Sequence, residues 1–269
     1  MNANRGARIV LHSLERSRSQ RILWLLEELK LKYEIQPYKR GPNERAPPEL
    51  KSIHPIGKAP ILSIYYPSVG GTASDGEPDR PINLAESAVI MEHLLDNFHQ
   101  PSSQAQHALV PARWVAGQEN QSGGETETWR QYRYYMHYTE GSLMPLVVTN
   151  ILMDVVQSAP PFFLKPLVGI VPSILKKEYT GPNFKTHLGY LEDQLATTPG
   201  NARYLAGTQF TAADILMSYP LIILREVKVL EKEHYPALWD YINGLTEMEG
   251  YRKAVRILEE VEEQKYRPF

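Results

Sequence analysis

The fold of this chain is decided by the stretch His54-Pro55-Ile56-Gly57-Lys58-Ala59-Pro60-Ile61-Leu62. Pro60 stands directly before an apolar run, residues 61–66, and proline belongs at the first residue of a strand because it has no N–H for the ladder. An X-Pro bond is also the one peptide bond that adopts cis at low cost, so we expect a cis bond between Ala59 and Pro60. That geometry would turn the backbone of Ala59 outward, where it can pair like a strand with a small peptide ligand.

A second stretch, Leu84-Ala85-Glu86-Ser87-Ala88-Val89-Ile90, places a carboxylate and a hydroxyl at the start of a predicted helix. The first N–H groups of a helix have no partner within it and carry partial positive charge. This combination suits a ligand that has both an ammonium and a carboxylate group. Together the two stretches predict a site for an extended, zwitterionic peptide.

The residues before the first stretch predict a strand, a helix and a second strand, over residues 8–12, 17–31 and 33–38. The helix has apolar residues at 22, 25, 26 and 29, the spacing of one buried helix face. A strand–helix–strand unit of this length is right-handed, so the two strands should be parallel. Residues 40–54 are polar and rich in proline, which indicates a loop with one short helix.

Residues 61–66 and 82–84 are predicted to form a β-hairpin, followed by a helix over 86–98. The order βαβ-ββα predicts a thioredoxin-like domain over residues 1–99. Residues 100–124 are rich in Gln, Ser and Gly, which indicates a linker, and residues 125–269 are predicted to form an all-helical domain. The predicted fold class is therefore α/β plus all-α.

One helix start in the second domain is marked strongly, by Phe210-Thr211-Ala212-Ala213-Asp214-Ile215. Thr211 and Asp214 form a variant of the capping box, and Phe210 and Ile215 a hydrophobic staple. We expect this helix start to be buried, with Asp214 accepting hydrogen bonds from backbone N–H groups near Thr211. This motif predicts a role in folding rather than in catalysis.

Composition excludes several classes of function. The 269 residues carry a formal charge of −2, which gives no electrostatic footprint for nucleic acid. There is no cysteine, which excludes disulfides, thiolate zinc sites and a cysteine nucleophile. The histidines lack metal-ligand spacing and no glycine-rich phosphate loop is present, so we expect neither a metal nor a nucleotide cofactor.

The most apolar region, residues 143–175, is interrupted by Asp154, Lys165 and five prolines. No run reaches the 18 or more apolar residues that are typical of a membrane span. Such interruptions would leave backbone polar groups without partners in lipid. We therefore expect a buried helical hairpin or the wall of a pocket, and no transmembrane segment.

Several motifs resemble the glutathione transferase family, and more narrowly its fungal branch. The matching motifs are Ser17-Arg18-Ser19-Gln20-Arg21, Ile56-Gly57-Lys58-Ala59-Pro60, Glu86-Ser87, Thr211-Ala212-Ala213-Asp214, Tyr38-Lys39-Arg40 and Glu140-Gly141-Ser142-Leu143. The resemblance implies that the peptide is glutathione, a co-substrate whose thiolate is added to hydrophobic electrophiles or used to reduce organic hydroperoxides. It also implies a homodimer, and a protein that is cytoplasmic or attached peripherally to the endoplasmic reticulum membrane.

The same resemblance implies roles for individual residues. Lys58 would bind the glycine carboxylate of glutathione, and the backbone of Ala59, held by Pro60, would pair with the peptide. Glu86 and Ser87 would bind the γ-glutamyl ammonium and carboxylate groups. His54 and Arg40 are weaker candidates for a carboxylate. For Lys58 the alternative is a solvated lysine, and for Glu86 and Ser87 it is helix capping.

The group that donates to the thiol of glutathione is left open by the sequence. Many family members use a tyrosine after the first strand, and residues 12–15 contain none. Ser17 stands four residues before Arg21, the spacing of the serine donor in other members, so Ser17 is the first candidate. Ser13 and Ser19 are alternatives, and an ordinary helix N-cap is the other interpretation of Ser17.

Arg18 could add positive potential near the thiol. The resemblance also implies a hydrophobic pocket lined by Tyr134, Tyr138 and apolar residues of 143–163, although an aromatic stripe on a helix can equally belong to a core.

Two other functions stay open: a non-catalytic module of the same fold, and an enzyme dedicated to one biosynthetic intermediate. The lack of cysteine argues against family members that pass mixed disulfides through an enzyme thiol.

Overall fold

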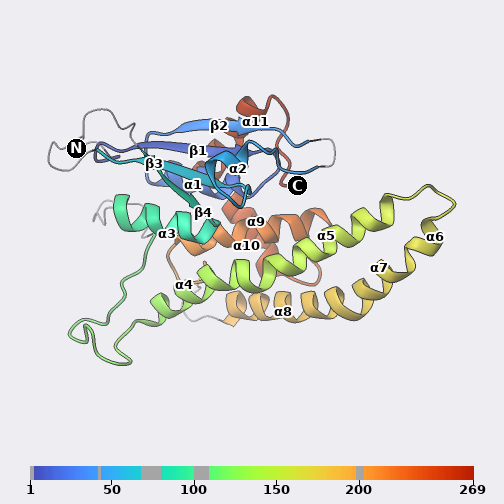
Figure 1. Cartoon of the computed structure of the whole chain (residues 1–269). Coiled ribbons are helices and arrows are strands. Elements are labelled where there is room, and N and C mark those ends of the chain that lie inside the picture. Colours follow the sequence, from blue (N-terminus) through green and yellow to red (C-terminus); the bar gives the residue numbers. More distant parts are fainter. Residues whose placement is uncertain (1–2, 42–43, 68–79, 100–108, 198–202) are drawn as a thin grey trace. The chain divides into compact units, whose positions relative to one another are not determined.

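The computed structural model describes residues 3–41, 44–67, 80–99, 109–197 and 203–269. Contacts divide the chain into two compact units, which Figure 1 shows in sequence colours. The first unit joins Met1–Leu109 with Thr246–Phe269, and the second is Val110–Leu245. The sequence predicts instead that the first domain ends at residue 99 and that all of 125–269 belongs to the helical domain. The difference arises because the last helix packs against the first helix of the chain.

The first unit contains a four-stranded sheet with the strand order β2-β1-β3-β4. Its strands are β1 (Arg8–Leu14), β2 (Glu34–Tyr38), β3 (Ile61–Tyr65) and β4 (Ile82–Ala85). β1 pairs in parallel with β2 and antiparallel with β3, and β3 pairs antiparallel with β4. The predicted parallel pair, the hairpin and the thioredoxin-like class of this unit are confirmed.

The described residues of the first unit form four helices. They are α1 (Ser19–Glu28), α2 (Leu50–Ile53), α3 (Ser87–Phe98) and α11 (Glu249–Glu262). α1 contacts β1, α3 and α11, so it is covered on several sides. For this reason its central residues, from Ile22 to Leu26, are fully buried, and the helix lacks an exposed polar face over this stretch.

The approach of α11 to α1 depends on Gly250. A β-carbon at this position would lie 2.7 Å from Nε1 and 2.9 Å from Cδ1 of the Trp24 ring. Trp24 is fully buried and its Nε1 donates to Oε1 of Glu28 at 2.9 Å, so the ring has little room to move. A side chain at 250 would therefore push the two helices apart.

We expect Gly250→Ala to lower the free energy of unfolding by about 1–3 kcal/mol, the usual cost of overpacking. Gly244→Ala is the matched control, because Gly244 lies in another helix and a β-carbon there would meet no atom within 4 Å. That control should be neutral, or stabilising by up to about 1 kcal/mol through helix propensity. Thermal unfolding of both variants checks this, and equal midpoints would contradict the close contact.

A line of hydrogen bonds crosses the sheet and holds α2 in place. His12 bonds through Nδ1 to the hydroxyl of Tyr38 at 3.0 Å and through Nε2 to Oγ of Ser63 at 2.9 Å. Ser63 donates to Oδ1 of Asn83 at 2.6 Å, and Asn83 donates to the carbonyl of Ile53 at 2.8 Å. Because Ser63 uses its proton on Asn83, it accepts from Nε2–H of His12. Burial lowers the pKa of His12, which favours this neutral ring.

The second unit is helical, as the sequence predicted. Its helices are α4 (Glu127–Tyr138), α5 (Met144–Ser158), α6 (Lys165–Val168), α7 (Ile170–Leu175), α8 (Gly181–Thr197), α9 (Ala212–Glu226) and α10 (Pro236–Thr246), with π-helical turns η1 (Thr139–Leu143) and η2 (Lys176–Thr180). α9 is central, because all residues from Ala212 to Leu224 are buried and α4, α5 and η1 contact it.

Asp214 anchors the start of α9, which confirms the predicted capping box. Oδ2 of its carboxylate accepts from N of Thr211 at 2.8 Å and from Oγ1 of Thr211 at 3.0 Å. Oδ1 accepts from N of Leu205 at 3.1 Å and from the hydroxyl of Tyr241 at 2.7 Å. Burial raises the pKa of Asp214, and these hydrogen bonds oppose that effect by stabilising the carboxylate.

The expected burial of residues 143–175 is wrong for the second half of this region. In Figure 1, α5 runs out to a turn and α6 and α7 return beside it. Residues such as Leu152, Val155, Leu167 and Val171 are exposed there. Within the described part of the chain, the main contacts of α6 and α7 are with α5, with each other and, for α7, with η2.

One continuous helical run among the described residues, Glu127–Ser158, is long and apolar enough to cross a membrane by length and composition. Its most apolar window has a mean hydropathy of 1.2 and is 33 % buried. Core helices of globular proteins pass the same test, so this run is weak evidence for a membrane span.

Candidate functional site

The sheet register brings the predicted site segments to one end of the first unit. Leu14 at the end of β1 lies opposite Tyr38 at the end of β2. His12 lies opposite Ile61 at the start of β3, and Ile61 lies opposite Ala85 at the end of β4. The segments that leave or enter the sheet at this end carry Ser17, Arg40, Lys58, Ala59 and Glu86. Residues that are far apart in the sequence are therefore close to one end of the same sheet.

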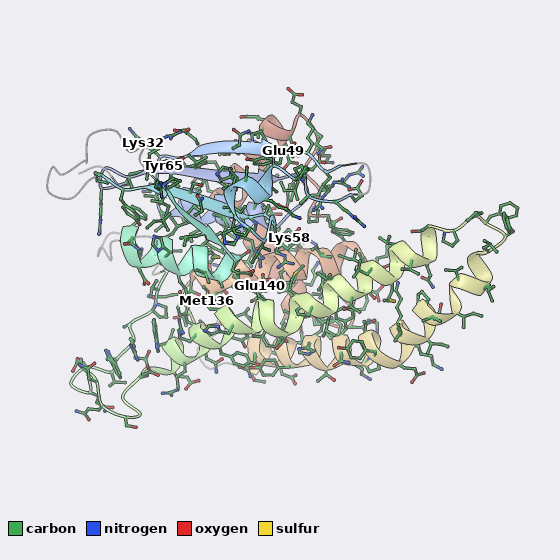
Figure 2. All side chains as sticks on the ribbon, in the orientation of Figure 1. Lys32, Glu49, Lys58, Tyr65, Met136 and Glu140 are labelled. Carbon is green, nitrogen blue, oxygen red and sulfur yellow. The ribbon has the colours of Figure 1, made fainter. Side chains whose placement is uncertain are left out.

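The turn from α2 to β3 has the predicted cis peptide bond between Ala59 and Pro60. Pro60 is buried and Ala59 is half-buried. Lys58, labelled in Figure 2, is exposed in this turn. His54 is half-buried, and its Nδ1 accepts from the backbone N of Ile56 at 3.4 Å, so it braces the turn. A role of Lys58 or His54 in binding a carboxylate stays a prediction.

Glu86 and Ser87 stand at the start of α3. Glu86 is the N-cap residue, is exposed, and its side chain makes no capping hydrogen bond. The helix therefore does not use this carboxylate, which remains turned to solvent. Ser87 is buried, and its Oγ accepts from the guanidinium NH2 of Arg21 at 3.2 Å.

The backbone of Glu86 is held in an unusual conformation, with φ 71° and ψ 118°. A side chain with positive φ is uncommon, and outside the left-handed helical region such a conformation costs on the order of 1–3 kcal/mol. Strained residues of this kind gather at binding and catalytic sites. The conformation of Glu86 therefore points to a functional position.

Arg21 also belongs to this site, although its sequence motif did not predict this. In the sequence Arg21 only marks the spacing from Ser17, but in the structure its side chain is fully buried and reaches from α1 to the start of α3. An arginine among the apolar residues of a buried helix was the available signal, because buried charges require partners.

Arg40 is hydrogen-bonded to the loop that follows β1. Its guanidinium donates to the carbonyl oxygens of Glu15 at 3.2 Å, Arg16 at 2.9 Å and Glu44 at 2.8 Å. Its backbone N donates to Oε1 of Glu15 at 2.6 Å. These contacts support a structural role in shaping the entrance to α1, and a contact with glutathione stays a prediction.

The three serine candidates differ in accessibility. Ser17 is half-buried at the entrance to α1, and its Oγ accepts from N of Ser19 at 3.2 Å and donates to Oγ of Ser19 at 2.9 Å. Ser13 is 3 % exposed and Ser19 is 1 % exposed. Arg18, the N-cap of α1, is half-buried. Ser17 is thus the serine that a ligand in solvent could reach most readily.

Tyr134 and Tyr138 belong to an aromatic cluster in the second unit. Their rings stack with centroids 5.4 Å apart, and Tyr190 of α8 lies beside both. Tyr138 is buried and its hydroxyl lies 2.6 Å from Nδ1 of His187, while burial raises the pKa of Tyr138. These contacts join α4 to α8, so the structure gives both tyrosines a packing role, and their place in a substrate pocket stays a prediction.

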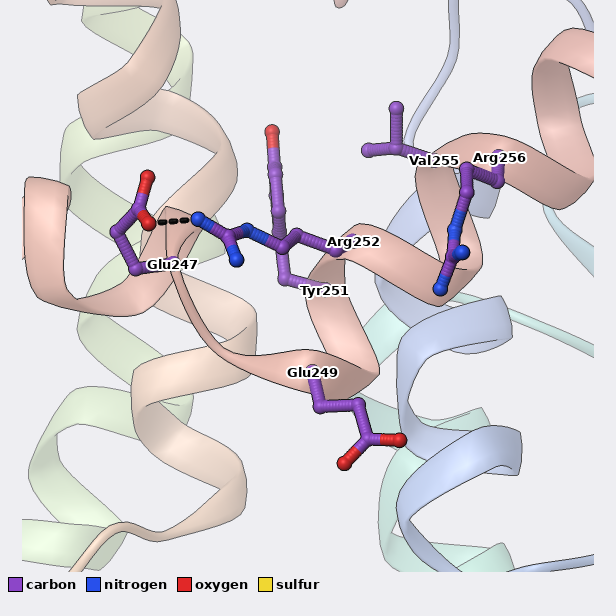
Figure 3. Close-up of a pocket in the computed structure, with 6 residues that line it drawn as sticks. All are labelled: Glu247, Glu249, Tyr251, Arg252, Val255 and Arg256. Atoms are coloured by element: carbon purple, nitrogen blue, oxygen red, sulfur yellow. Dashed lines mark ion pairs between the residues drawn. The ribbon is translucent and has the colours of Figure 1, made fainter.

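A surface hollow of about 520 Å³ lies at the start of α11 (Figure 3). It is lined by Glu247, Glu249, Tyr251, Arg252, Val255 and Arg256. Glu247 and Arg252 form an ion pair within it. The hollow shares no residue with the predicted site.

Within the described ranges, no group of three or more His, Asp or Glu side chains could hold a metal ion.

Comparisons with known proteins agree with the fold of both units. The family model of the glutathione S-transferase N-terminal domain matches residues 17–97, and that of the C-terminal domain matches residues 182–244. A solved glutathione S-transferase from Actinobacillus pleuropneumoniae has a TM-score of 0.62 and 26 % identity, with 96 % of this chain and 94 % of that chain covered. The glutathione transferase URE2P6 from Phanerochaete chrysosporium, solved with oxidized glutathione, has a TM-score of 0.66 and 19 % identity, with 95 % and 98 % covered.

Two curated relatives are similar over most of their length. Glutathione S-transferase 1 of Saccharomyces cerevisiae is 35 % identical over 244 residues, which cover 90 % of this chain and 92 % of the relative. Glutathione S-transferase 3 of Schizosaccharomyces pombe is 31 % identical over 226 residues, which cover 84 % and 78 %. With this identity over nearly the whole length, and with a thioredoxin-like unit and a helical unit in one chain, the chain belongs to the glutathione S-transferase family.

Proposed function

We propose that this protein is a glutathione transferase, which binds glutathione at the end of its sheet and adds the thiolate to hydrophobic electrophiles. The observation that carries this proposal is the pairing of Ile61 with Ala85. It brings the turn at Ala59 next to Glu86, so that a peptide backbone and a peptide ammonium can be bound together. The solvent-facing carboxylate of Glu86 suits the ammonium, and the exposed Lys58 suits a carboxylate at the other end of the peptide.

The chemistry depends on keeping the thiol of glutathione ionised. A free thiol with a pKa of about 8.5 is only about 3 % ionised at pH 7. The N-terminus of α1 carries partial positive charge and Ser17 has a hydroxyl beside it, and both favour the thiolate. A thiolate of lower pKa is also a weaker nucleophile, with a Brønsted slope of about 0.4–0.5. Holding the sulfur close to the electrophile must therefore supply much of the acceleration.

Isothermal titration calorimetry with glutathione is the direct test of this function. Saturable heat, together with conjugation of a chloronitrobenzene acceptor, supports a transferase. Saturable binding without conjugation of this acceptor or reduction of an organic hydroperoxide would favour a non-catalytic binding module. Absence of binding would overturn the proposal.

We predict that Ser17→Ala moves the ionisation of bound glutathione to higher pH, because the thiolate loses a hydrogen-bond donor. A hydrogen bond to a charged group contributes about 1.5–3 kcal/mol, which corresponds to a shift of about 1–2 pKa units. The pH profile of the conjugation rate measures this shift. Ser13→Ala is the matched control and should leave the profile unchanged. If neither variant moves it, the backbone N–H groups of α1 or Arg18 hold the thiolate.

The assembly that we propose is a homodimer in the cytoplasm, and the role is the conjugation of toxic hydrophobic compounds. Sedimentation velocity tests the assembly against a chain mass of 30.7 kDa. A sedimenting mass of one chain at micromolar concentration would contradict the dimer.

A further inference from the structure

The outgoing half of α5, together with α6 and α7, exposes an unusual amount of apolar surface. We call residues 152–175 the apolar arm. Of the twenty large apolar side chains that are exposed in the described residues, twelve lie in this arm. Phe162 at the turn is 84 % exposed and Phe163 beside it is 66 % exposed. Contiguous apolar patches of more than a few hundred Å² are rare on monomers and mark sites of interaction.

Lysines outnumber acidic residues in and next to the apolar arm, where the two acids are Asp154 at its start and Glu178 just after its end. Between Asp154 and Glu178 the sequence contains three lysines, at 165, 176 and 177, and neither Asp nor Glu. Lys176 forms an ion pair with Asp154 at the inner end of the arm, and Lys177, whose side chain is 84 % exposed, forms a solvent-exposed ion pair with Glu178 at 3.5 Å. Exposed aromatic and aliphatic side chains with lysines at their border are typical of segments that lie in the interface of a membrane.

The apolar arm is too interrupted to span a bilayer. α6 (Lys165–Val168) and α7 (Ile170–Leu175) are short, whereas a spanning helix needs about 20 residues. The turn between α5 and α6 also has backbone N–H and C=O groups that belong to no helix, and lipid offers these groups no hydrogen-bond partners. Contact with the interfacial layer, where water reaches the backbone, avoids this cost.

We propose that the apolar arm inserts its turn, led by Phe162 and Phe163, into the interfacial layer of a membrane that contains anionic phospholipid. The apolar side chains leave water, and the lysines stay at the level of the phosphate groups. A second copy of this chain is a poorer occupant, because lysines outnumber acids in and next to each arm, so that two arms would carry charge of the same net sign. The inference does not rest on the proposed catalytic function, since it uses only residues of the arm.

Sedimentation of the full chain with vesicles of phosphatidylcholine, with and without phosphatidylserine, tests the proposal. We expect binding to the vesicles that contain phosphatidylserine, and weaker binding at high salt. Phe162→Ser should weaken vesicle binding about tenfold or more, because one aromatic side chain no longer leaves water. Lys177→Gln should weaken it about fivefold, and only when phosphatidylserine is present.

Phe269→Ser is the matched control, since Phe269 is also exposed, at 40 %, but lies outside the arm. It should bind vesicles like the unaltered protein. Thermal unfolding checks that each variant is folded, and calorimetry with glutathione checks that the first unit is intact. No vesicle binding, or equal binding by Phe162→Ser and the control, overturns the proposal. It is also overturned if Phe162→Ser, without lipid, separates a complex of two copies, because the arm would then be a protein interface.

Discussion

Asp214→Ala is expected to destabilise the protein by about 4 kcal/mol or more. The Asp214 carboxylate is fully buried and accepts four hydrogen bonds, from Thr211 N and Oγ1, Leu205 N and the Tyr241 hydroxyl. Alanine leaves these donors buried without a partner, and each such group costs about 1–3 kcal/mol. Domains are stable by only about 5–15 kcal/mol. A measurable fraction of the variant molecules should therefore have an unfolded helical unit under native conditions.

Thermal unfolding followed by far-UV circular dichroism measures this effect. Asp240→Ala is the matched control, because Asp240 is an exposed acid in α10 and should change stability by less than about 0.5 kcal/mol. If Asp214→Ala does not accumulate as folded protein, Asp214→Asn offers an intermediate case, because it keeps one acceptor oxygen but presents an NH2 group to the other donors. Wild-type midpoints for both Asp214 variants would show that this cluster does not stabilise the unit.

Glu86→Ala is expected to weaken glutathione binding about 10–100-fold. In the proposed site the carboxylate binds the ammonium of glutathione, and a hydrogen bond between charged groups contributes about 1.5–3 kcal/mol. Isothermal titration calorimetry measures the dissociation constant. The stability of the free protein should hardly change, because the side chain is exposed and makes no capping bond.

The variant Glu86→Gly should change glutathione affinity and protein stability in opposite directions, so it distinguishes the two effects. Glycine adopts a φ of 71° without the clash that a β-carbon causes, so this variant should be more stable than the unaltered protein by about 1 kcal/mol. It should nevertheless lose glutathione affinity as Glu86→Ala does. Asp96→Ala, an exposed acid at the far end of α3, is the control for a general loss of negative charge. An unchanged affinity in both Glu86 variants would refute the assigned role of this carboxylate.

Features that depend on neighbouring residues could be predicted well. The proline at 60 predicted both the cis bond and the start of β3, because a missing N–H is a property of that residue alone. Thr211 and Asp214 predicted their own hydrogen bonds, since three residues separate them. The parallel pairing of β1 and β2 followed from the handedness of a short strand–helix–strand unit.

Contacts between residues that lie far apart along the chain could not be predicted. The sequence showed that Arg21 and Ser87 exist, but not that 66 residues of chain fold back to join them. It showed Tyr134 and Tyr138 on one helix, but not that Tyr190 and His187 would lie against them. Such contacts depend on the positions of whole helices, which local patterns do not determine.

By itself the sequence determined the parallel strand pair and the hairpin of the thioredoxin-like unit, the cap at Asp214 and the two stretches that would bind a zwitterionic peptide. Only the tertiary structure decided that α11 packs on α1, that Glu86 keeps its carboxylate free of the helix, and that twelve large apolar side chains of the apolar arm are exposed. The physical reason is that local preferences act through neighbouring backbone groups. Whether an apolar side chain leaves water, in contrast, depends on which distant surfaces come to cover it.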